Sequence, residues 1–282
     1  MTESAKLAKF GGACVSEPDM YRRIAGLIRN DTARQFLVVS AISGVTDSIL
    51  ASVSKPLAEK EIDSFVAEMR HVHLRLLSKG ERAGDVAVEA IEALCTKLSR
   101  LLYGISYTEE ITPRVQDFAL SFGERLAAQV IASNLRIDGV DAVSFEADQI
   151  GLMTDENYGN ASVLLEETKL HMAPFLRRQE GAGHVSVITG FFGQSPEGKT
   201  ATFGRGGSDY SAAVVAYALG LPLIEIWKDI GGFMSADPKI VRKRSPSPPC
   251  RTTRPRSFRT SARRSCIRVR SNRRARPVRR SW

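Results

Sequence analysis

The sequence predicts an α/β fold in which a mainly parallel sheet is flanked by helices. Over residues 5–241, short apolar runs of β-type residues alternate with longer segments of helical spacing, the pattern that produces parallel sheets with helical connections. Glycine- and serine-rich turns follow the apolar runs. The content of 43% hydrophobic and 25% charged residues is that of a globular chain. We therefore expect one sheet domain over residues 1–241.

The first half of this domain begins with two strands, over residues 5–10 and 36–41. Ser16 stands where a hydroxyl can cap a helix, and apolar residues at helical spacing extend that helix to about Arg29. Residues 57–102 carry two amphipathic helical patterns and little strand character. We therefore expect an all-helical insertion there.

The second half begins with a helix whose start has two sequence signals. Thr112 is a capping residue and Pro113 suits the first turn, so the helix should begin here and run to about Asn134. The pattern then predicts a strand, a helix, a strand, a helix and a strand, over residues 142–145, 161–178, 184–192, 208–219 and 223–227.

Composition excludes several classes of protein. No apolar run approaches the roughly 18 residues of a membrane span, and the start MTESAKLAKFGG lacks the order of a signal peptide. The four cysteines, Cys14, Cys95, Cys250 and Cys266, form no CxxC pair and no metal-ligand spacing with the four histidines. We expect a cytoplasmic protein with reduced thiols, no membrane partner and no metal ligand set of its own.

Charge divides the chain at about Val241. Residues 242–282 hold 16 of the 40 Lys and Arg residues and no Asp or Glu, so the body has 24 basic against 31 acidic residues. A tail of this composition buries too little apolar surface to fold, and we expect it to be disordered. An alternative takes the tail at face value, as an arm that binds nucleic acid or acidic partners.

Two turns that follow the first two strands carry groups suited to a small anionic ligand. In KFGG, residues 9–12, paired glycines let backbone N–H groups approach a phosphate, and Lys9 adds a positive charge. In SAISGVT, residues 40–46, hydroxyls leave the carboxyl end of a parallel strand, where open α/β sheets bind ligands. A plain turn and plain helix capping are the alternatives.

The segment SFGER, residues 121–125, places a glycine inside a predicted helix. Gly123 costs the helix about 1 kcal/mol relative to alanine. Such a cost suggests close backbone packing or the approach of a ligand beside Glu124. An ordinary salt-bridged glutamate is the alternative.

The most specific segment is GRGGSDY, residues 204–210, at the start of a predicted helix. First-turn N–H groups lack partners within the helix and bind anions, and Arg205 offers a fork that suits a carboxylate or phosphate. Asp209 in the same turn would repel a bare anion. The mixed charge therefore fits an amino acid or a Mg-nucleotide better, with pure helix capping as the alternative.

Two further segments could line a nucleotide site. Residues 227–239 combine glycines, carboxylates and lysines, which fits a nucleotide-lining loop or a solvated turn. Residues 193–200, GQSPEGKT, satisfy the phosphate-loop pattern GxxxxGK[ST]. β-like residues follow where that motif requires a helix, and Glu197 would put a negative charge among the phosphates. We therefore predict a β-hairpin turn at residues 195–198.

Taken together and in this order, five segments resemble those of the aspartokinases of the amino-acid-kinase family. The segments are KFGGACV, SAISGVT, SFGERL, FGRGGSDYSAA and IWKDIGGFMSADPKIV. The resemblance spans about residues 6–241, and the pairing of SFGE with GRGGSDY argues against a glutamate or carbamate kinase. It implies a three-layer αβα sandwich and transfer of a phosphoryl group from ATP, with Mg²⁺, to the β-carboxylate of L-aspartate. It also implies a homo-oligomer acting in the first step toward lysine, threonine and methionine.

The resemblance implies roles for individual residues. The catalytic residues would be Lys9 and Asp209. The aspartate site would consist of Ser40, Thr46, Glu124, Arg205, Gly206, Gly207 and Ser208. The ATP site would consist of Lys9, Gly11, Gly12, Lys228, Asp229, Met234 and Lys239. Arg205 would pair with the α-carboxylate of the substrate and Glu124 with its ammonium group. The sequence departs from the family at Ala13 and Cys14, usually Thr and Ser, and at residues 228, 234 and 239, usually Thr, Tyr and Arg.

This residue inventory suits the chemistry. An aspartate side chain has a reference pKa of about 3.9, so it is already an ionised nucleophile and needs no general base. Phosphoryl transfer requires mainly positioning and charge neutralisation, which Lys9, backbone N–H groups and Mg²⁺ would supply.

The resemblance also suggests an origin for the basic tail. Codons chosen for residues 257–268 can encode the family's stretch LSYFGAKVLHP when they are read from the third base of each codon. We infer a single frameshift close to Lys243. The shift would remove a lysine that the family places near the ATP phosphates, and we expect the family's regulatory ACT domains to be missing. An inactive remnant of the enzyme is therefore a further alternative, and no feedback inhibition by lysine or threonine is expected.

Overall fold

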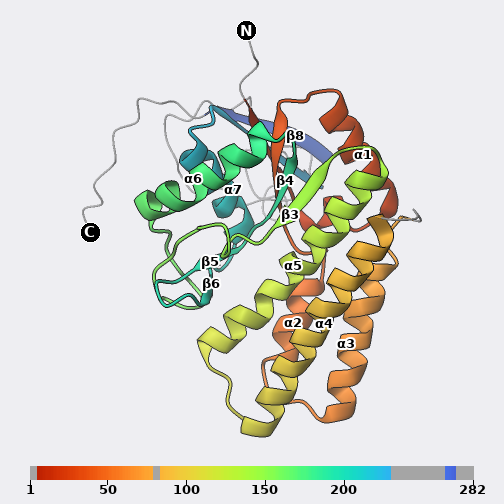
Figure 1. Cartoon of the computed structure of the whole chain (residues 1–282). Coiled ribbons are helices and arrows are strands. Elements are labelled where there is room, and N and C mark those ends of the chain that lie inside the picture. The colour runs from red at the N-terminus through yellow and green to blue at the C-terminus, as the bar shows by residue number, and fades with distance from the viewer. Residues whose placement is uncertain (1–4, 79–82, 230–263, 271–282) are drawn as a thin grey trace, which may run out of the picture.

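The computed structural model describes residues 5–78, 83–229 and 264–270. Its main sheet has the strand order β3-β4-β2-β1-β7-β8, and helices cover both of its faces (Figure 1). The strands are β3 (Ala142–Phe145), β4 (Val185–Thr189), β2 (Arg34–Val39), β1 (Lys6–Phe10), β7 (Leu223–Asp229) and β8 (Arg264–Arg270). The first five run parallel. The predicted fold, a mainly parallel sheet flanked by helices, is confirmed.

The parallel strands direct alternate side chains into two hydrophobic cores. In β2, Leu37 and Val39 belong to the core on the side of α1 (Pro18–Arg29) and α5 (Pro113–Ile137). Phe36 and Val38 belong to the other core, under α6 (Leu165–Gly181) and α7 (Gly207–Leu219). This division follows from the two-residue period of a strand. The result is a three-layer αβα sandwich, as expected of a parallel sheet covered on both faces.

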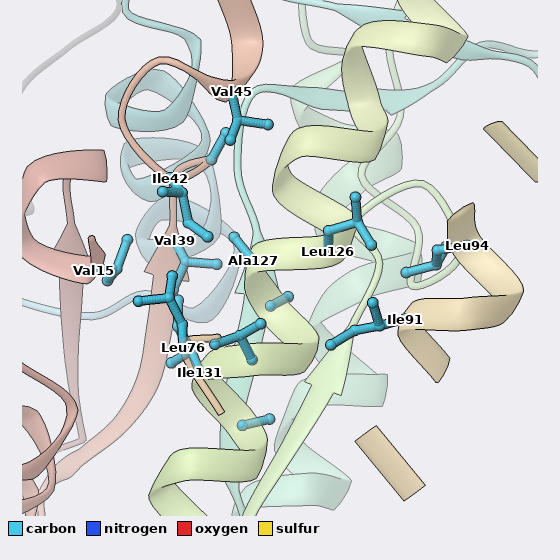
Figure 2. Close-up of a cluster of buried hydrophobic side chains, with 14 of the residues drawn as sticks. Val15, Val39, Ile42, Val45, Leu76, Ile91, Leu94, Leu126, Ala127 and Ile131 are labelled. Atoms are coloured by element: carbon cyan, nitrogen blue, oxygen red, sulfur yellow. The ribbon is translucent and has the colours of Figure 1, made fainter. Parts of the chain in front are cut away.

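The helices α2 (Val45–Ser52), α3 (Glu59–Leu74) and α4 (Ala83–Thr108) extend away from the sheet along α5 (Figure 1). Residues 57–102 of the expected helical insertion therefore fall largely on α3 and α4. Figure 2 shows α5 between the two regions, with Ala127 toward Val39 of β2 and Leu126 toward Ile91 of α4. All four side chains are buried in one core. The insertion and the sheet are thus packed as one body around α5.

The start of α5 follows the predicted capping pattern. Thr112 Oγ1 accepts a hydrogen bond from the N–H of Val115 at 3.3 Å, and Pro113 is the first helical residue. Near the other end, the buried Asn134 accepts from Ser78 N and donates to Leu76 O, at 2.8 and 3.0 Å.

Neither this helix nor another in the described ranges is both long and apolar enough to cross a membrane.

Ser16 does not cap α1, contrary to the sequence prediction. The helix begins at Pro18 with Glu17 in the cap position, and Glu17 makes no side-chain capping bond. The hydroxyl of Ser16 instead donates to Gly12 O at 2.7 Å and accepts from Ser43 N at 3.3 Å. Ser16 therefore ties the turn after β1 to the turn after β2.

Two other predicted boundaries are wrong for identifiable reasons. The strand predicted over 184–192 is divided by Phe191, whose φ of 75° is left-handed, so the chain turns out of the sheet there. The helix predicted from residue 161 begins at Leu165, because the preceding segment is engaged elsewhere. Ala161 N donates to Thr202 O at 2.8 Å, and Val163 forms an isolated bridge with Thr154.

The phosphate-loop string lies on a β-hairpin, as predicted. Strands β5 (Phe192–Gln194) and β6 (Thr200–Thr202) pair antiparallel, and Gly198 N donates to Ser195 O at 2.8 Å in the turn. The hydroxyl of Thr200 donates to Asp148 Oδ2 at 2.7 Å. A helix does not follow the string, so it cannot cradle a phosphate in the manner of that motif.

One segment of the basic tail lies within the described ranges. Residues 264–270 form β8, which pairs antiparallel with β7 along its whole length. Without β8, β7 would be an edge strand with unpaired backbone groups, and such an edge is a template for any segment of β propensity. The sequence RSCIRVR supplies β-branched residues for that role. The other tail residues lie outside the described ranges, and their disorder stays a prediction.

Two helical glycines give a matched test of the packing of α5. A Cβ on Gly123 would lie 2.9 Å from the Cβ of Ala41, whereas a Cβ on Gly104 of α4 would meet nothing within 4 Å. We expect Gly123→Ala to lower the free energy of unfolding by about 1–3 kcal/mol through overpacking. Gly104→Ala should raise it by about 0.5–1 kcal/mol, because alanine favours a helix. Urea unfolding measures both, and equal effects would contradict the close approach.

Candidate active site

A cavity of about 810 Å³ opens at the carboxyl ends of β1, β2 and β7. Open α/β sheets bind their ligands at this edge. The cavity brings together ten of the residues singled out from the sequence: Lys9, Ser40, Thr46, Glu124, Arg205, Gly206, Gly207, Ser208, Asp209 and Lys228. They come from two strands, three helices and two loops that lie far apart in the sequence.

The remaining candidates are placed less completely. Gly12 begins the short helix η1 (Gly12–Val15), and a Cβ on it would lie 2.5 Å from Ala41 O, so only glycine allows the turns after β1 and β2 to meet. Gly11 lies beside the cavity, with its N–H bonded to Trp227 O at 3.0 Å. Asp229 ends β7. Met234 and Lys239 lie outside the described residues.

Glu124 is a buried carboxyl group at one end of the cavity. Its residue is 3% exposed, and Oε1 accepts a hydrogen bond from Ala41 N at 3.1 Å. Oε2 is buried and has no hydrogen-bond partner among the described residues. Burial raises the pKa of Glu124 to about 8, although the Ala41 N–H and the charge of Lys9 favour the ionised form. A group with a spare acceptor and a raised pKa is suited to receive a cationic ligand.

Two lysines and an aspartate occupy another part of the cavity. Lys9 Nζ lies 2.8 Å from Asp209 Oδ1, and Lys228 Nζ lies 2.5 Å from Asp209 Oδ2. Burial would raise the pKa of Asp209, but the charges of Lys9 and Lys228 outweigh it and leave that pKa below its usual value. The aspartate is therefore ionised at neutral pH, and the group as a whole keeps a positive charge.

The loop before α7 brings a helix N-terminus to the same cavity. Gly206 caps the helix with a φ of 78°, a conformation that glycine adopts without strain. A Cβ on Gly207 would lie 2.7 Å from a ring carbon of Phe191, and a Cβ on Gly190 would lie 2.7 Å from that of Ser208. These close approaches set the first turn of α7 against the ends of β4 and β5. Arg205 is exposed at the mouth of the cavity, beside this turn.

Sequence reasoning missed Asp117, which also lines the cavity. Asp117 is 1% exposed, and its Oδ2 accepts from the N–H groups of Gly159 and Thr202, each at 2.8 Å. Its Oδ1 accepts from the hydroxyl of Thr202 at 2.7 Å. Gly159 and Thr202 lie 42 and 85 residues from Asp117 along the chain. The residues next to Asp117 in the sequence therefore do not indicate these contacts.

Arg125 lies about two turns further along α5 and bonds to the same hairpin strand, through Thr200 Oγ1 at 3.1 Å. It is 5% exposed and forms ion pairs with Glu146 and Asp148. Its guanidinium group lies 4.6 Å from the ring centroid of Phe192, a cation–π distance. Asp117 and Arg125 together hold α5 to the β5–β6 hairpin and so fix the height at which Glu124 enters the cavity.

A glycine-rich helix start, paired lysines and a buried carboxylate at one sheet edge define a small-molecule site of mixed charge. The chain belongs to the amino acid kinase family, whose pattern matches residues 5–248. Within that family its relatives include aspartokinases. It is 31% identical to "Aspartokinase 1, chloroplastic" of Arabidopsis thaliana, over 85% of this chain and 42% of that one.

Bacterial relatives extend the comparison. The chain is 30% identical to the "Lysine-sensitive aspartokinase 3" of Escherichia coli (strain K12), over 83% of this chain and 51% of that one. A crystal structure of E. coli aspartokinase III in complex with aspartate and ADP has a TM-score of 0.78 and 28% identity, over 86% of this chain and 53% of that one. The chain thus spans about half the length of the relatives that it matches.

The raised pKa of Glu124 predicts a specific dependence of stability on pH. The ordinary pKa of 4.5 applies to the unfolded chain and the value of about 8 to the folded one. Between these values the folded state holds a proton that the unfolded state lacks, so this contribution to stability is lost as the pH rises. Glu124→Gln removes the titration. The variant should gain stability relative to wild type from pH 5 to pH 8, by roughly 1.4 kcal/mol per unit of pKa shift.

Urea unfolding of both proteins across that pH range measures the difference, in which all other titrations cancel. A difference that is constant between pH 5 and pH 8 would show that Glu124 has an ordinary pKa in the folded state.

Proposed function

We propose that this protein transfers the γ-phosphoryl group of ATP to the β-carboxylate of L-aspartate, giving 4-phospho-L-aspartate. The observation that carries the proposal is that one cavity holds both an acceptor for a cation and donors for an anion. The acceptor is the buried, unpartnered oxygen of Glu124, and the donors are the two lysines that pair with Asp209. Such a cavity suits a ligand with an ammonium group and a partner with phosphates. The similarity to a structure described as a complex with aspartate and ADP supports the choice of ligands.

In this proposal different polar residues of the cavity bind different groups of the substrate. Oε2 of Glu124 accepts a hydrogen bond from the substrate ammonium, which supplies the partner that this oxygen lacks. Arg205 forms a bidentate pair with the α-carboxylate. Ser40, Thr46 and Ser208 donate to the β-carboxylate and orient it for attack.

The β-carboxylate attacks the γ-phosphorus, and the bond to the bridging oxygen of ADP breaks. The nucleophile is ionised at neutral pH, so no general base is required. Lys9 balances the negative charge that spreads over the phosphoryl oxygens in the transition state. Gly11, Gly12, Lys228 and Asp229 would line the nucleotide, and Met234 and Lys239 are proposed for the same site.

Mg²⁺ completes the proposed chemistry by neutralising phosphate charge. Among the described residues, no group of three or more His, Cys, Asp or Glu side chains could hold a metal ion. The carboxylate nearest the phosphate-binding lysines, Asp209, is already paired with both of them. We propose that Mg²⁺ enters the site on the ATP phosphates.

Trapping of the product tests the proposed reaction directly. Hydroxylamine converts an acyl phosphate to a hydroxamate, so the full chain with Mg-ATP should give hydroxamate with L-aspartate and far less with L-glutamate. Lys9→Met should lower the rate at least about 100-fold, the loss typical of one charge-stabilising group. Lys60→Met, on the exposed face of α3, is the matched control and should keep the wild-type rate. No hydroxamate from a chain with a cooperative thermal transition would instead support the inactive remnant.

Ligand binding should also change the ionisation of Glu124. At pH 7 its carboxyl is largely protonated, given a pKa of about 8. An ammonium group at hydrogen-bond distance favours the ionised form, so binding of L-aspartate should release up to one proton. Calorimetric titrations in buffers of different ionisation enthalpy measure this number. Glu124→Gln should release none, and an equal release by both proteins would place the aspartate ammonium elsewhere.

A further inference from the structure

The carboxylate of Asp209 lies between two ammonium groups that come from neighbouring strands. Lys9 on β1 pairs with Oδ1 at 2.8 Å, and Lys228 on β7 pairs with Oδ2 at 2.5 Å. The Lys9 side chain is 5% exposed, the Lys228 side chain 26% and the Asp209 side chain 31%. The three groups are thus partly enclosed, but their open side faces the cavity that all three line.

The register of the sheet places the two lysines on the same face. Strands β1 and β7 are parallel, with Phe10 opposite Trp227, and Gly11 N donates to Trp227 O. Lys228 therefore follows Trp227 at the level of Gly11, and residues 9 and 11 share a face because the strand period is two. A Cβ on Gly11 would lie 3.8 Å from both Lys9 Nζ and Lys228 Cγ. Because position 11 has no side chain, nothing at that position separates the two lysines.

The charges of this group favour a polyanion. Two ammonium groups and one carboxylate leave one net positive charge, and the N-terminus of α7, which carries Asp209 in its first turn, adds a partial one. Each oxygen of Asp209 already has a lysine partner. Asp209 therefore sets the separation of the ammonium groups, and each ammonium keeps further N–H donors for a ligand. A phosphate chain offers several oxygens and more than one negative charge, so it can accept hydrogen bonds from both ammonium groups at once.

We propose that Lys9 and Lys228 form a two-lysine clamp for the phosphate chain of the nucleotide, with Asp209 as the residue that positions both. Lys228 then contacts phosphate oxygens rather than only lining the nucleotide. Position 228 is usually threonine in the family that the sequence resembles, so the second lysine would be a property of this chain. The identity of the phosphate compound as ATP rests on the proposed function, whereas the clamp itself rests on the contacts of Lys228.

Binding measurements test the clamp without any catalytic step. The full chain and its variants are titrated calorimetrically with ADP and with inorganic tripolyphosphate, in the absence of aspartate. Lys228→Thr should weaken both ligands about tenfold, the size of one charge-assisted contact on a partly exposed side chain. Lys228→Arg keeps the charge and should stay within about threefold of wild type. Lys60→Thr is the matched control for net charge and should have no effect.

A double-mutant cycle tests the positioning role of Asp209. If Asp209 holds Lys228 at the phosphates, Lys228→Thr should cost much less in an Asp209→Asn background than in wild type, about threefold or less. An equal cost in both backgrounds would overturn the positioning role. Thermal melting of each variant verifies that it is folded before its affinity is compared.

Three results would overturn the clamp. Equal affinities of wild type and Lys228→Thr for both ligands would make Lys228 a mere counter-ion of Asp209. A loss confined to ADP would place Lys228 at the nucleoside, and a folded wild type that binds neither ligand would leave no phosphate site. The hydroxamate assay is independent of these outcomes, because a chain without activity can show the clamp and an active chain can lack it.

Discussion

The close approach of α5 to the turn after β2 is the contact on which the site depends. At Gly123 the helix comes so near that a methyl group would lie 2.9 Å from the side chain of Ala41. The next residue, Glu124, is thereby buried with one oxygen on the Ala41 N–H. The same helix packs against α3 and α4 on its insertion side, and Arg125 bonds it to Thr200 on its hairpin side. The position of one carboxyl group thus depends on packing along most of the domain.

The cavity concentrates groups that would each destabilise the fold if they were left alone. A buried carboxyl with a free oxygen loses hydration without full compensation, which is why its pKa is raised. Lys9, almost fully buried, is tolerated because Asp209 faces it. Glu124 avoids a buried charge by taking up a proton, whereas Lys9 keeps its charge and pairs with Asp209. Glu124 can still accept from a cationic group, and the lysines can still donate to an anionic one.

The sequence sufficed for the fold and for ten of the residues that line the cavity, because their signals are local. Thr112-Pro113 marks a helix start, and the glycines of GRGGSDY mark a turn with positive φ before α7. Local signals did not reach Asp117, whose partners are distant in the chain, or the pairing of Lys228 with Asp209, which depends on sheet order. The break in the strand at Phe191 was not predicted for another reason. A left-handed φ at an aromatic residue is rare and is imposed by its tertiary contacts.

The hairpin that carries GQSPEGKT shows how conformation decides the meaning of a short string. Its Gly193 is pressed against Leu152, because a Cβ at this position would lie 2.5 Å from the Leu152 carbonyl oxygen. A Cβ on Gly198 at the tip would meet only the amide of Gln194, at 3.9 Å. The hydroxyl of Thr200 donates a hydrogen bond to Asp148 and accepts one from Arg125. The same sequence pattern that binds a nucleotide in phosphate-loop proteins here forms a structural hairpin that packs against Leu152 and Asp148. The base of the hairpin therefore excludes a larger residue through lack of space, whereas its tip, where Gly198 has a φ of 74°, restricts the sequence through backbone conformation.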